Sequence, residues 1–149
     1  MIFIESAKKS LGQNFLVDNN IIKKIINISN INNKVVLEIG CGYGHLTDKI
    51  LEQKPKKFIG IEKDKKLSFF LEKKFDKYKN VKIINEDILN IINKPNFGRN
   101  IIIFGNLPYN ISTKILTNLI TIKKWPPWYD SIFFMFQKEV ADRIIAKKN

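Results

Sequence analysis

One short segment combines residue types that could position an amine for alkylation. Asn106, Leu107, Pro108 and Tyr109 follow an apolar run at 101–104 that has the character of a buried strand. Proline has no N–H and a fixed φ, and it pushes the preceding residue into an extended conformation. The asparagine side-chain oxygen and a nearby backbone carbonyl could then both accept hydrogen bonds from one planar NH₂ group. The nitrogen lone pair would be left free to attack an electrophile.

The tyrosine adds a second element of this chemistry, because its ring offers a flat face on which an unstacked nucleobase could lie. We therefore predict that Asn106, Leu107, Pro108 and Tyr109 form a catalytic turn. An ordinary turn at the end of a strand is the alternative, since Asn and Pro are common in such turns. The position of the segment in the chain favours the catalytic interpretation, because it follows other strand ends that carry glycines and acids.

A glycine-rich segment, Glu-Ile-Gly-Cys-Gly-Tyr-Gly at 38–44, follows an earlier predicted strand and precedes a helix. Glycines such as Gly40 and Gly42 let a backbone turn tightly and approach a ligand closely. Glu62 lies 22 residues beyond Gly40, at the spacing where an acid binds a ribose diol in nucleotide-binding α/β folds. A dinucleotide fingerprint would carry a third glycine where His45 stands, so a nucleoside cofactor without a pyrophosphate fits better.

A third candidate segment ends the next predicted strand. Asp87 could accept a hydrogen bond from an adenine amine, and Ile88 could lie beside the adenine ring. A glycine turn, a carboxylate for the ribose and a carboxylate for the adenine amine therefore stand at the ends of successive strands. Together they are strong evidence for a nucleoside site, because ligands bind at the carboxyl ends of strands in such sheets.

The elements that position these residues alternate along the chain. An amphipathic helix is predicted at 19–29, capped by Asp18. Apolar runs predict strands and periodic stretches predict helices, and their alternation indicates βαβ units in an α/β fold with a mostly parallel sheet. The predicted strands are 35–39, 58–61, 81–84, 100–104 and 131–136, and the predicted helices are 45–53, 65–77, 112–122 and 138–147.

Several aromatic side chains are predicted to stabilise this fold. Phe69, Phe70 and Phe75 are expected in the core, and Trp125 and Trp128 are expected to pin a proline-containing loop to the body of the protein. The only histidine is expected to be a partly exposed residue at a helix start, without a catalytic role.

Composition limits the functional class. The chain has 149 residues, enough for one domain at 1–149, and no apolar run approaches the roughly 18 residues of a membrane span. No signal peptide is recognisable, and the single cysteine, Cys41, fits a reducing cytoplasm. No cluster of His, Cys and carboxylates indicates a metal site. The net charge of +12 favours a polyanionic partner, although 24 Lys against two Arg is also typical of an A/T-rich genome.

Taken together, these motifs resemble those of the ribosomal RNA adenine dimethyltransferases. The resemblance runs from Lys-Ser-Leu-Gly-Gln-Asn-Phe-Leu at 9–16 to Phe-Gln-Lys-Glu-Val-Ala-Asp-Arg at 136–143, which is nearly the whole chain. It implies a Rossmann-like class I methyltransferase fold with helices on both faces of the sheet, and S-adenosylmethionine as cofactor. Leu107 and the Asn-Ile-Ser-Thr at 110–113 favour the branch that dimethylates two adjacent adenines in a 3′-terminal hairpin of small-subunit ribosomal RNA over the large-subunit resistance enzymes.

The resemblance also implies roles for individual residues. Gln13, Asn14 and Leu16 would border the methionine end of the cofactor, although Gln13 and Asn14 could instead cap the first helix. Gly40 and Gly42 would lie beneath the cofactor, and Asn106 would touch both cofactor and target. Glu62 would hold the ribose, Asp87 the adenine amine and Ile88 the ring.

Two other functional classes compete with this hypothesis. A methyltransferase for a different amine, such as a DNA adenine or a glutamine amide, could use a similar turn. A non-catalytic RNA-binding assembly factor could keep the fold. The presence of Glu62, Asp87 and Asn106 argues against a non-catalytic assembly factor. The segments at 13–16 and 137–139 argue against a methyltransferase for a different amine.

The resemblance further implies that two more strands and a small helical domain follow the fifth strand in such enzymes. We therefore expect this chain to be a truncated form of a protein that is monomeric at full length. It should bind the cofactor, bind RNA weakly in a salt-sensitive way, and turn over slowly or not at all on ribosomal subunits. Its fifth strand should be an unprotected edge prone to self-association.

Overall fold

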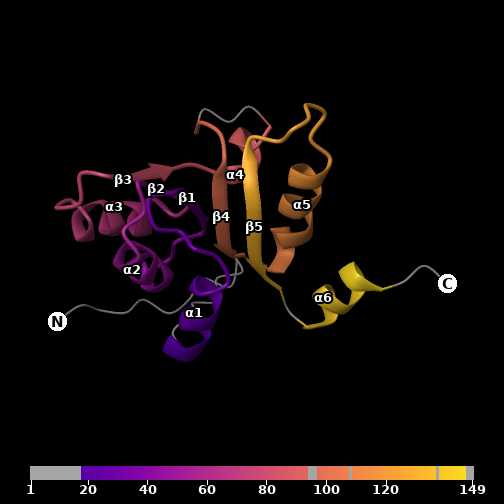
Figure 1. The fold of residues 1–149 in the computed structure, drawn as a ribbon, viewed down its shortest axis with the longest axis horizontal. Coiled ribbons are helices and arrows are strands. Elements are labelled where there is room, and N and C mark those ends of the chain that lie inside the picture. The colour runs from indigo at the N-terminus through magenta and orange to yellow at the C-terminus, as the bar shows by residue number, and fades with distance from the viewer. Residues whose placement is uncertain (1–17, 94–96, 108, 137, 147–149) are drawn as a thin grey trace.

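The fold was analysed in a computed structural model, which describes residues 18–93, 97–107, 109–136 and 138–146. Five strands alternate with helices, as the sequence predicts (Figure 1). The strands are β1 Val35–Ile39, β2 Lys57–Glu62, β3 Val81–Asn85, β4 Ile101–Asn106 and β5 Tyr129–Met135. Each predicted strand is confirmed within two residues at either end.

The helices also follow the prediction, with one addition. They are α1 Asn19–Ile26, α2 His45–Glu52, α3 Lys65–Lys74, α4 Ile88–Ile91, α5 Tyr109–Ile120 and α6 Lys138–Ile145. The four-residue α4 is too short to produce a helical period in the sequence. Aspartates cap three of these helices by accepting backbone hydrogen bonds: Asp18 before α1, Asp64 before α3 and Asp87 before α4.

All five strands lie parallel in one sheet with the order β3-β2-β1-β4-β5. The chain builds outward from β1 to β3 and then returns to place β4 on the other side of β1. The point between β1 and β4, where the order reverses, is the topological switch point at which open α/β sheets bind ligands. The register aligns the carboxyl ends, since Ile39 pairs with both Ile61 and Gly105.

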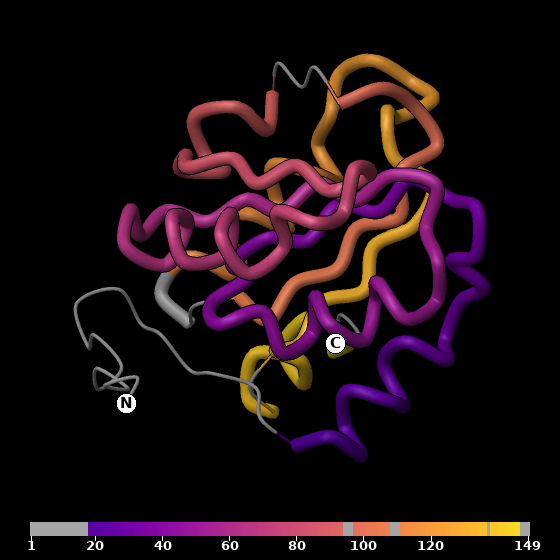
Figure 2. The backbone as a smooth tube through the Cα atoms, turned by 90° about the vertical axis from the view of Figure 1, so that its left-hand side faces the viewer, coloured from indigo at the N-terminus to yellow at the C-terminus, as the bar shows by residue number. Residues whose placement is uncertain are grey.

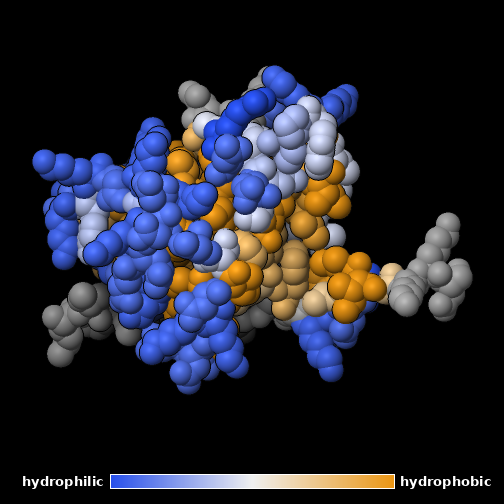
Figure 3. All heavy atoms as spheres, viewed as in Figure 1, coloured by the Kyte–Doolittle hydropathy of each residue, from blue (hydrophilic) through white to orange (hydrophobic). Residues whose placement is uncertain are grey.

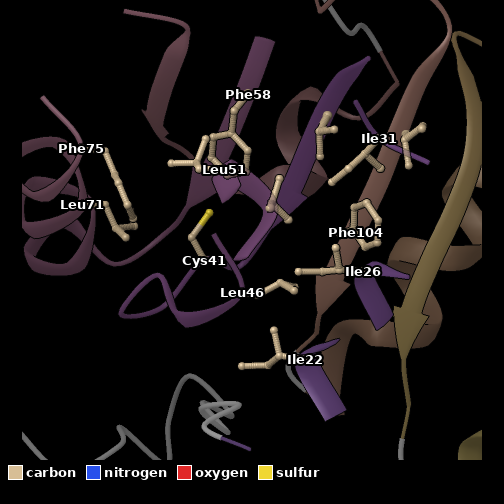
Figure 4. Packing of buried hydrophobic residues seen from close by; sticks show 13 residues of the cluster. Ile22, Ile26, Ile31, Cys41, Leu46, Leu51, Phe58, Leu71, Phe75 and Phe104 are labelled. Atoms are coloured by element: carbon tan, nitrogen blue, oxygen red, sulfur yellow. The ribbon is translucent and has the colours of Figure 1, made fainter. Parts of the chain in front are cut away.

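Two apolar clusters cover the two faces of the sheet. One joins α1, α2 and α3 to the sheet and includes Ile22, Leu46, Leu71 and Phe104 (Figure 4). The other joins α4 and α5 to the opposite face. Figure 2 shows the backbone from the α3 side, with β4 and β5 running side by side behind that helix. The structure therefore confirms the Rossmann-like arrangement with helices on both faces.

At the far side of the sheet, β5 is an edge strand within the described part of the chain. Its Phe133 ring stacks on Phe104 at a centroid distance of 5.2 Å. None of the α6 residues is buried, and Ile144 and Ile145 are exposed. Figure 3 shows a largely hydrophilic surface over α2 and α3, whereas α6 presents an apolar patch next to a hydrophilic one. No described helix is both long and apolar enough to cross a membrane.

Two aromatic predictions were wrong. The Phe69 side chain is 61% exposed, whereas Phe70 is partly buried and Phe75 is buried, because successive helical positions differ by about 100° and cannot all face the sheet. Trp125 is 82% exposed and does not pin its loop. Trp128 does so instead, since its ring packs against Phe97 at 5.6 Å.

These two phenylalanines provide a matched test of the packing. Phe75→Ala should lower the free energy of unfolding by about 3–5 kcal/mol, because it leaves a cavity beneath α3. Phe69→Ala should cost less than about 1 kcal/mol, because only an exposed contact with Lys73 is lost. Urea unfolding of both variants measures the difference, and equal losses would contradict this placement of α3.

Candidate functional site

The candidate site lies where the carboxyl ends of neighbouring strands meet. Gly40 follows β1, Glu62 ends β2, Asp87 follows β3 and Asn106 ends β4. Because β2-β1-β4 are adjacent and Glu62 pairs with Asn85 at the end of β3, all four residues share one edge of the sheet. The structure thus brings together the candidates that come from the described segments.

The glycine turn crosses the switch point. Gly40, Gly42 and Gly44 have φ of 75°, 56° and 79°, which L side chains rarely adopt. The Gly40 N–H donates to the Ile61 carbonyl at 2.8 Å, and a Cβ on Gly40 would lie 3.7 Å from the Asn106 carbonyl oxygen. The first glycine therefore sits directly between β2 and the end of β4, with its backbone open to close approach.

Glu62 is tied to this turn by its side chain. One carboxylate oxygen accepts from the Gly42 N–H at 2.9 Å, and the other accepts from the Asp64 N–H at 2.9 Å. Burial raises the pKa of Glu62, although these hydrogen bonds oppose the rise. A carboxylate oxygen can accept more than one hydrogen bond, so the group retains acceptor capacity for a ligand hydroxyl.

Asp87 occupies the next strand end. Its Oδ1 accepts from the Leu89 N–H at 3.0 Å, and its Oδ2 accepts from Lys63 Nζ at 2.8 Å. Partial burial pushes the pKa of Asp87 upward, but the Lys63 and Leu89 hydrogen bonds and the nearby lysine charges hold it below its usual value. Ile88 is buried in the cluster beneath α5.

The predicted catalytic turn is only partly described. Asn106 ends β4 and is partly buried, and the Leu107 side chain is buried in the same cluster as Ile88. Leu107 could therefore serve the site only through its backbone. Tyr109 begins α5. Pro108, the side chain of Tyr109, and Gln13, Asn14 and Leu16 lie outside the described residues, so their roles stay predictions.

Sequence reasoning missed the role of Glu38. This side chain is only 1% exposed and accepts a hydrogen bond of 2.7 Å from the hydroxyl of Thr47, a buried residue of α2. Burial, opposed by the Thr47 hydrogen bond and reinforced by Glu62, raises the pKa of Glu38 to about 8. An acid within the otherwise apolar strand Val-Val-Leu-Glu-Ile was the signal that could have revealed it.

A second missed residue clamps the glycine turn from outside. Lys74, at the end of α3, donates to the Tyr43 carbonyl at 3.1 Å and to Asp48 at 2.7 Å. The turn is therefore held by Lys74 and by Glu62, and the Glu38–Thr47 hydrogen bond joins the strand before it to the helix after it. This arrangement favours a preformed ligand site.

The remaining candidate groups have structural placements. Cys41 is buried, its Sγ would lie 2.8 Å from a Cβ added at Gly60, and burial raises its pKa well above the usual range, so it is an inert packing residue. His45 is exposed at the start of α2, as predicted. The described residues contain no group of three His, Cys, Asp or Glu side chains that could hold a metal ion.

Comparisons with known proteins agree with this geometry. A family model described as ribosomal RNA adenine dimethylase matches residues 4–149. The chain is 52% identical over 143 residues to the ribosomal RNA small subunit methyltransferase A of Pelagibacter ubique, covering 96% of this chain and 54% of that protein. The chain therefore spans about half the length of the curated relatives it matches.

Solved structures give the same fold. A dimethyladenosine transferase from Plasmodium falciparum has a TM-score of 0.74 at 33% identity, with 90% of this chain and 47% of that chain covered. The 23S rRNA methyltransferase ErmE also has a TM-score of 0.74, at 26% identity, with 87% and 50% covered.

The raised pKa of Glu38 predicts a specific pH dependence. Its carboxyl is protonated in the folded state up to about pH 8, whereas its unperturbed pKa is 4.5, so the unfolded state releases this proton first. Stability should therefore fall between these pH values, by at most about 1.4 kcal/mol per pH unit from this group. Glu38→Gln keeps an acceptor for Thr47 and should flatten that fall. Urea unfolding at pH 5 and pH 8 tests this, and the same pH slope in both proteins would contradict it.

Proposed function

The chain belongs to the ribosomal RNA adenine dimethylase family, and on this premise we propose that it binds S-adenosylmethionine and methylates adenine amines of small-subunit ribosomal RNA. The observation that carries the proposal is the closeness of two segments at the switch point, where a Cβ added to Gly40 would lie 3.7 Å from the Asn106 carbonyl oxygen. The glycine turn of the cofactor half therefore lies beside the residue that begins the predicted amine-binding turn.

The residues of the turn fit a nucleoside cofactor. Gly40 has a positive φ and no side chain, so a ligand can lie directly on its backbone. His45 replaces the third glycine of a pyrophosphate-binding turn, which disfavours a dinucleotide. In our proposal Glu62 accepts from the ribose hydroxyls, Asp87 accepts from the adenine amine, and Ile88 lies beneath the ring. Gln13, Asn14 and Leu16 are proposed to border the methionine end.

The chemistry then depends on alignment. The sulfonium cofactor would supply an electrophilic methyl group, with its thioether sulfur as a good leaving group. The Asn106 side-chain oxygen and the Pro108 carbonyl accept the two hydrogens of the target amine, which directs its lone pair toward that methyl and stabilises the developing positive charge. Tyr109 supplies the stacking face. Holding the reactants in line can lower the activation barrier by on the order of 7–11 kcal/mol at best. No strong base is needed, because the product ammonium loses its proton to water.

The anchoring of Leu107 supports this mechanism. Its buried side chain packs in the cluster with Ile103 of β4 and Ile115 of α5, which holds Leu107 in place directly after Asn106. A site that works by alignment requires such anchoring next to its acceptor groups.

The proposed substrate is the small-subunit RNA, with two adjacent adenines of a 3′-terminal hairpin as targets. The net charge of +12 supports a polyanionic partner. The 52% identical relative is named a small-subunit enzyme, whereas the 23S rRNA enzyme is 26% identical. We also propose a cytoplasmic location, a monomeric full-length protein, and RNA contacts supplied in part by sequence that the longer relatives contain.

Cofactor binding can be tested at Glu62. Glu62→Gln keeps the size of the side chain but removes the charge-assisted hydrogen bonds to the ribose, so affinity for S-adenosylhomocysteine should fall by about 1.5–3 kcal/mol. Glu52→Gln, an exposed change on α2, is the matched control and should bind like the parent chain. Calorimetric titration measures both variants. Unchanged affinity in Glu62→Gln would refute the ribose assignment.

Methyl transfer can be tested at Asn106. Asn106→Ala should keep the fold but reduce methylation of small-subunit RNA by about a hundredfold or more, because the amine loses a positioning acceptor. Asn118→Ala on the exposed side of α5 is the control and should transfer at the parent rate. Mass spectrometry of RNA incubated with labelled cofactor gives the rates. Transfer at the parent rate by Asn106→Ala would exclude it from the mechanism.

A further inference from the structure

Lys63 connects two strand ends of the candidate site. It directly follows Glu62, the last residue of β2, and its Nζ lies 2.8 Å from Oδ2 of Asp87, which follows β3. β2 and β3 are paired neighbours in the sheet. The lysine therefore bridges the proposed ribose position to the proposed adenine position.

The Asp87 carboxylate is held at both oxygens. Oδ1 accepts from the Leu89 N–H at 3.0 Å, which fixes the carboxylate to the start of α4. Oδ2 is held by Lys63. A carboxylate has about four acceptor positions, so two remain after these contacts. Lys63 therefore leaves acceptor capacity on Asp87 while it restricts the rotation of the group.

We propose that Lys63 is a positioning residue that orients the Asp87 carboxylate for the adenine amine of the cofactor. This inference rests on the proposed function, because it assumes that an adenine nucleoside binds at this edge. The lysine need not touch the cofactor. It acts by keeping the acceptor ionised and in one orientation before the ligand arrives, which lowers the ordering cost of binding.

The exposure of the pair separates this role from a structural one. The Lys63 side chain is 59% exposed and that of Asp87 is 20% exposed. Exposed ion pairs contribute little to folding stability. Loss of Lys63 should therefore leave the unfolding midpoint nearly unchanged, and its effect should appear in cofactor affinity.

The charges around Asp87 make the role visible in a pH profile. Lys63 faces it from the end of β2, Lys114 faces it from α5, and Glu86 precedes it in the chain. Partial burial favours the neutral acid, and the two lysines favour the carboxylate. Removing Lys63 should raise the pKa of Asp87, so the acceptor would be protonated at a higher pH.

The test is calorimetric titration of the 149-residue chain with S-adenosylhomocysteine across a series of pH values. Lys63→Met should weaken binding at neutral pH by about two- to fivefold, and the pH below which affinity is lost should be higher than in the parent chain. Lys63→Arg should retain the parent behaviour. Lys57→Met removes the same charge from the opposite end of β2 and should change neither quantity.

A double-variant comparison isolates the pathway through Asp87. In an Asp87→Asn background, Lys63→Met should cause no further loss of affinity. An independent further loss would overturn the inference, and so would parent-like affinity and an unshifted acidic limb in Lys63→Met. If the parent chain itself does not bind S-adenosylhomocysteine, the proposed function and this inference both fall. Urea unfolding of each variant confirms that affinity is compared between folded proteins.

Discussion

The hydrogen bond from the Gly42 N–H to the Glu62 carboxylate connects the two parts on which the candidate site depends. It adds a side-chain bond to the backbone bond from the Gly40 N–H to the Ile61 carbonyl, so the glycine turn after β1 is fixed to the end of β2 at two points. The same carboxylate accepts from the Asp64 N–H, so it also fixes the entry to α3. One buried acid thereby sets the positions of a turn, a strand end and a helix start.

This arrangement has an electrostatic cost. Glu38 and Glu62 are both buried, and burial raises the pKa of each carboxyl; the charge of Glu62 raises the pKa of Glu38 further. The two acids differ in their partners. Glu62 has two backbone donors, whereas Glu38 has the Thr47 hydroxyl and stays protonated up to about pH 8. A protonated Glu38 lets the site keep one buried anion, while the neutral second carboxyl joins β1 to α2 through Thr47.

The basic residues close to the site act locally. Lys74 ties α3 to the glycine turn and to Asp48, and Lys63 ties the ends of β2 and β3. The high lysine content is compatible with attraction to RNA, but these two side chains are engaged with carboxylates of the chain itself. The candidate site is therefore organised by cations and acids of the same half of the sheet, with Asn106 contributed by the other half.

The sequence alone determined the fold class and grouped the candidate site residues that follow strands. Apolar runs and helical periods depend on local residue order, and parallel strands always bring their carboxyl ends to one edge, so the sequence suffices to group Gly40, Glu62, Asp87 and Asn106. The tertiary structure decided what depends on contacts between distant segments. Glu38 meets Thr47 nine residues away, Lys63 meets Asp87 24 residues away, and Lys74 meets Asp48 26 residues away. Phe69 lies outside the core for the same reason, because only the docking of α3 on the sheet decides which of its faces is buried.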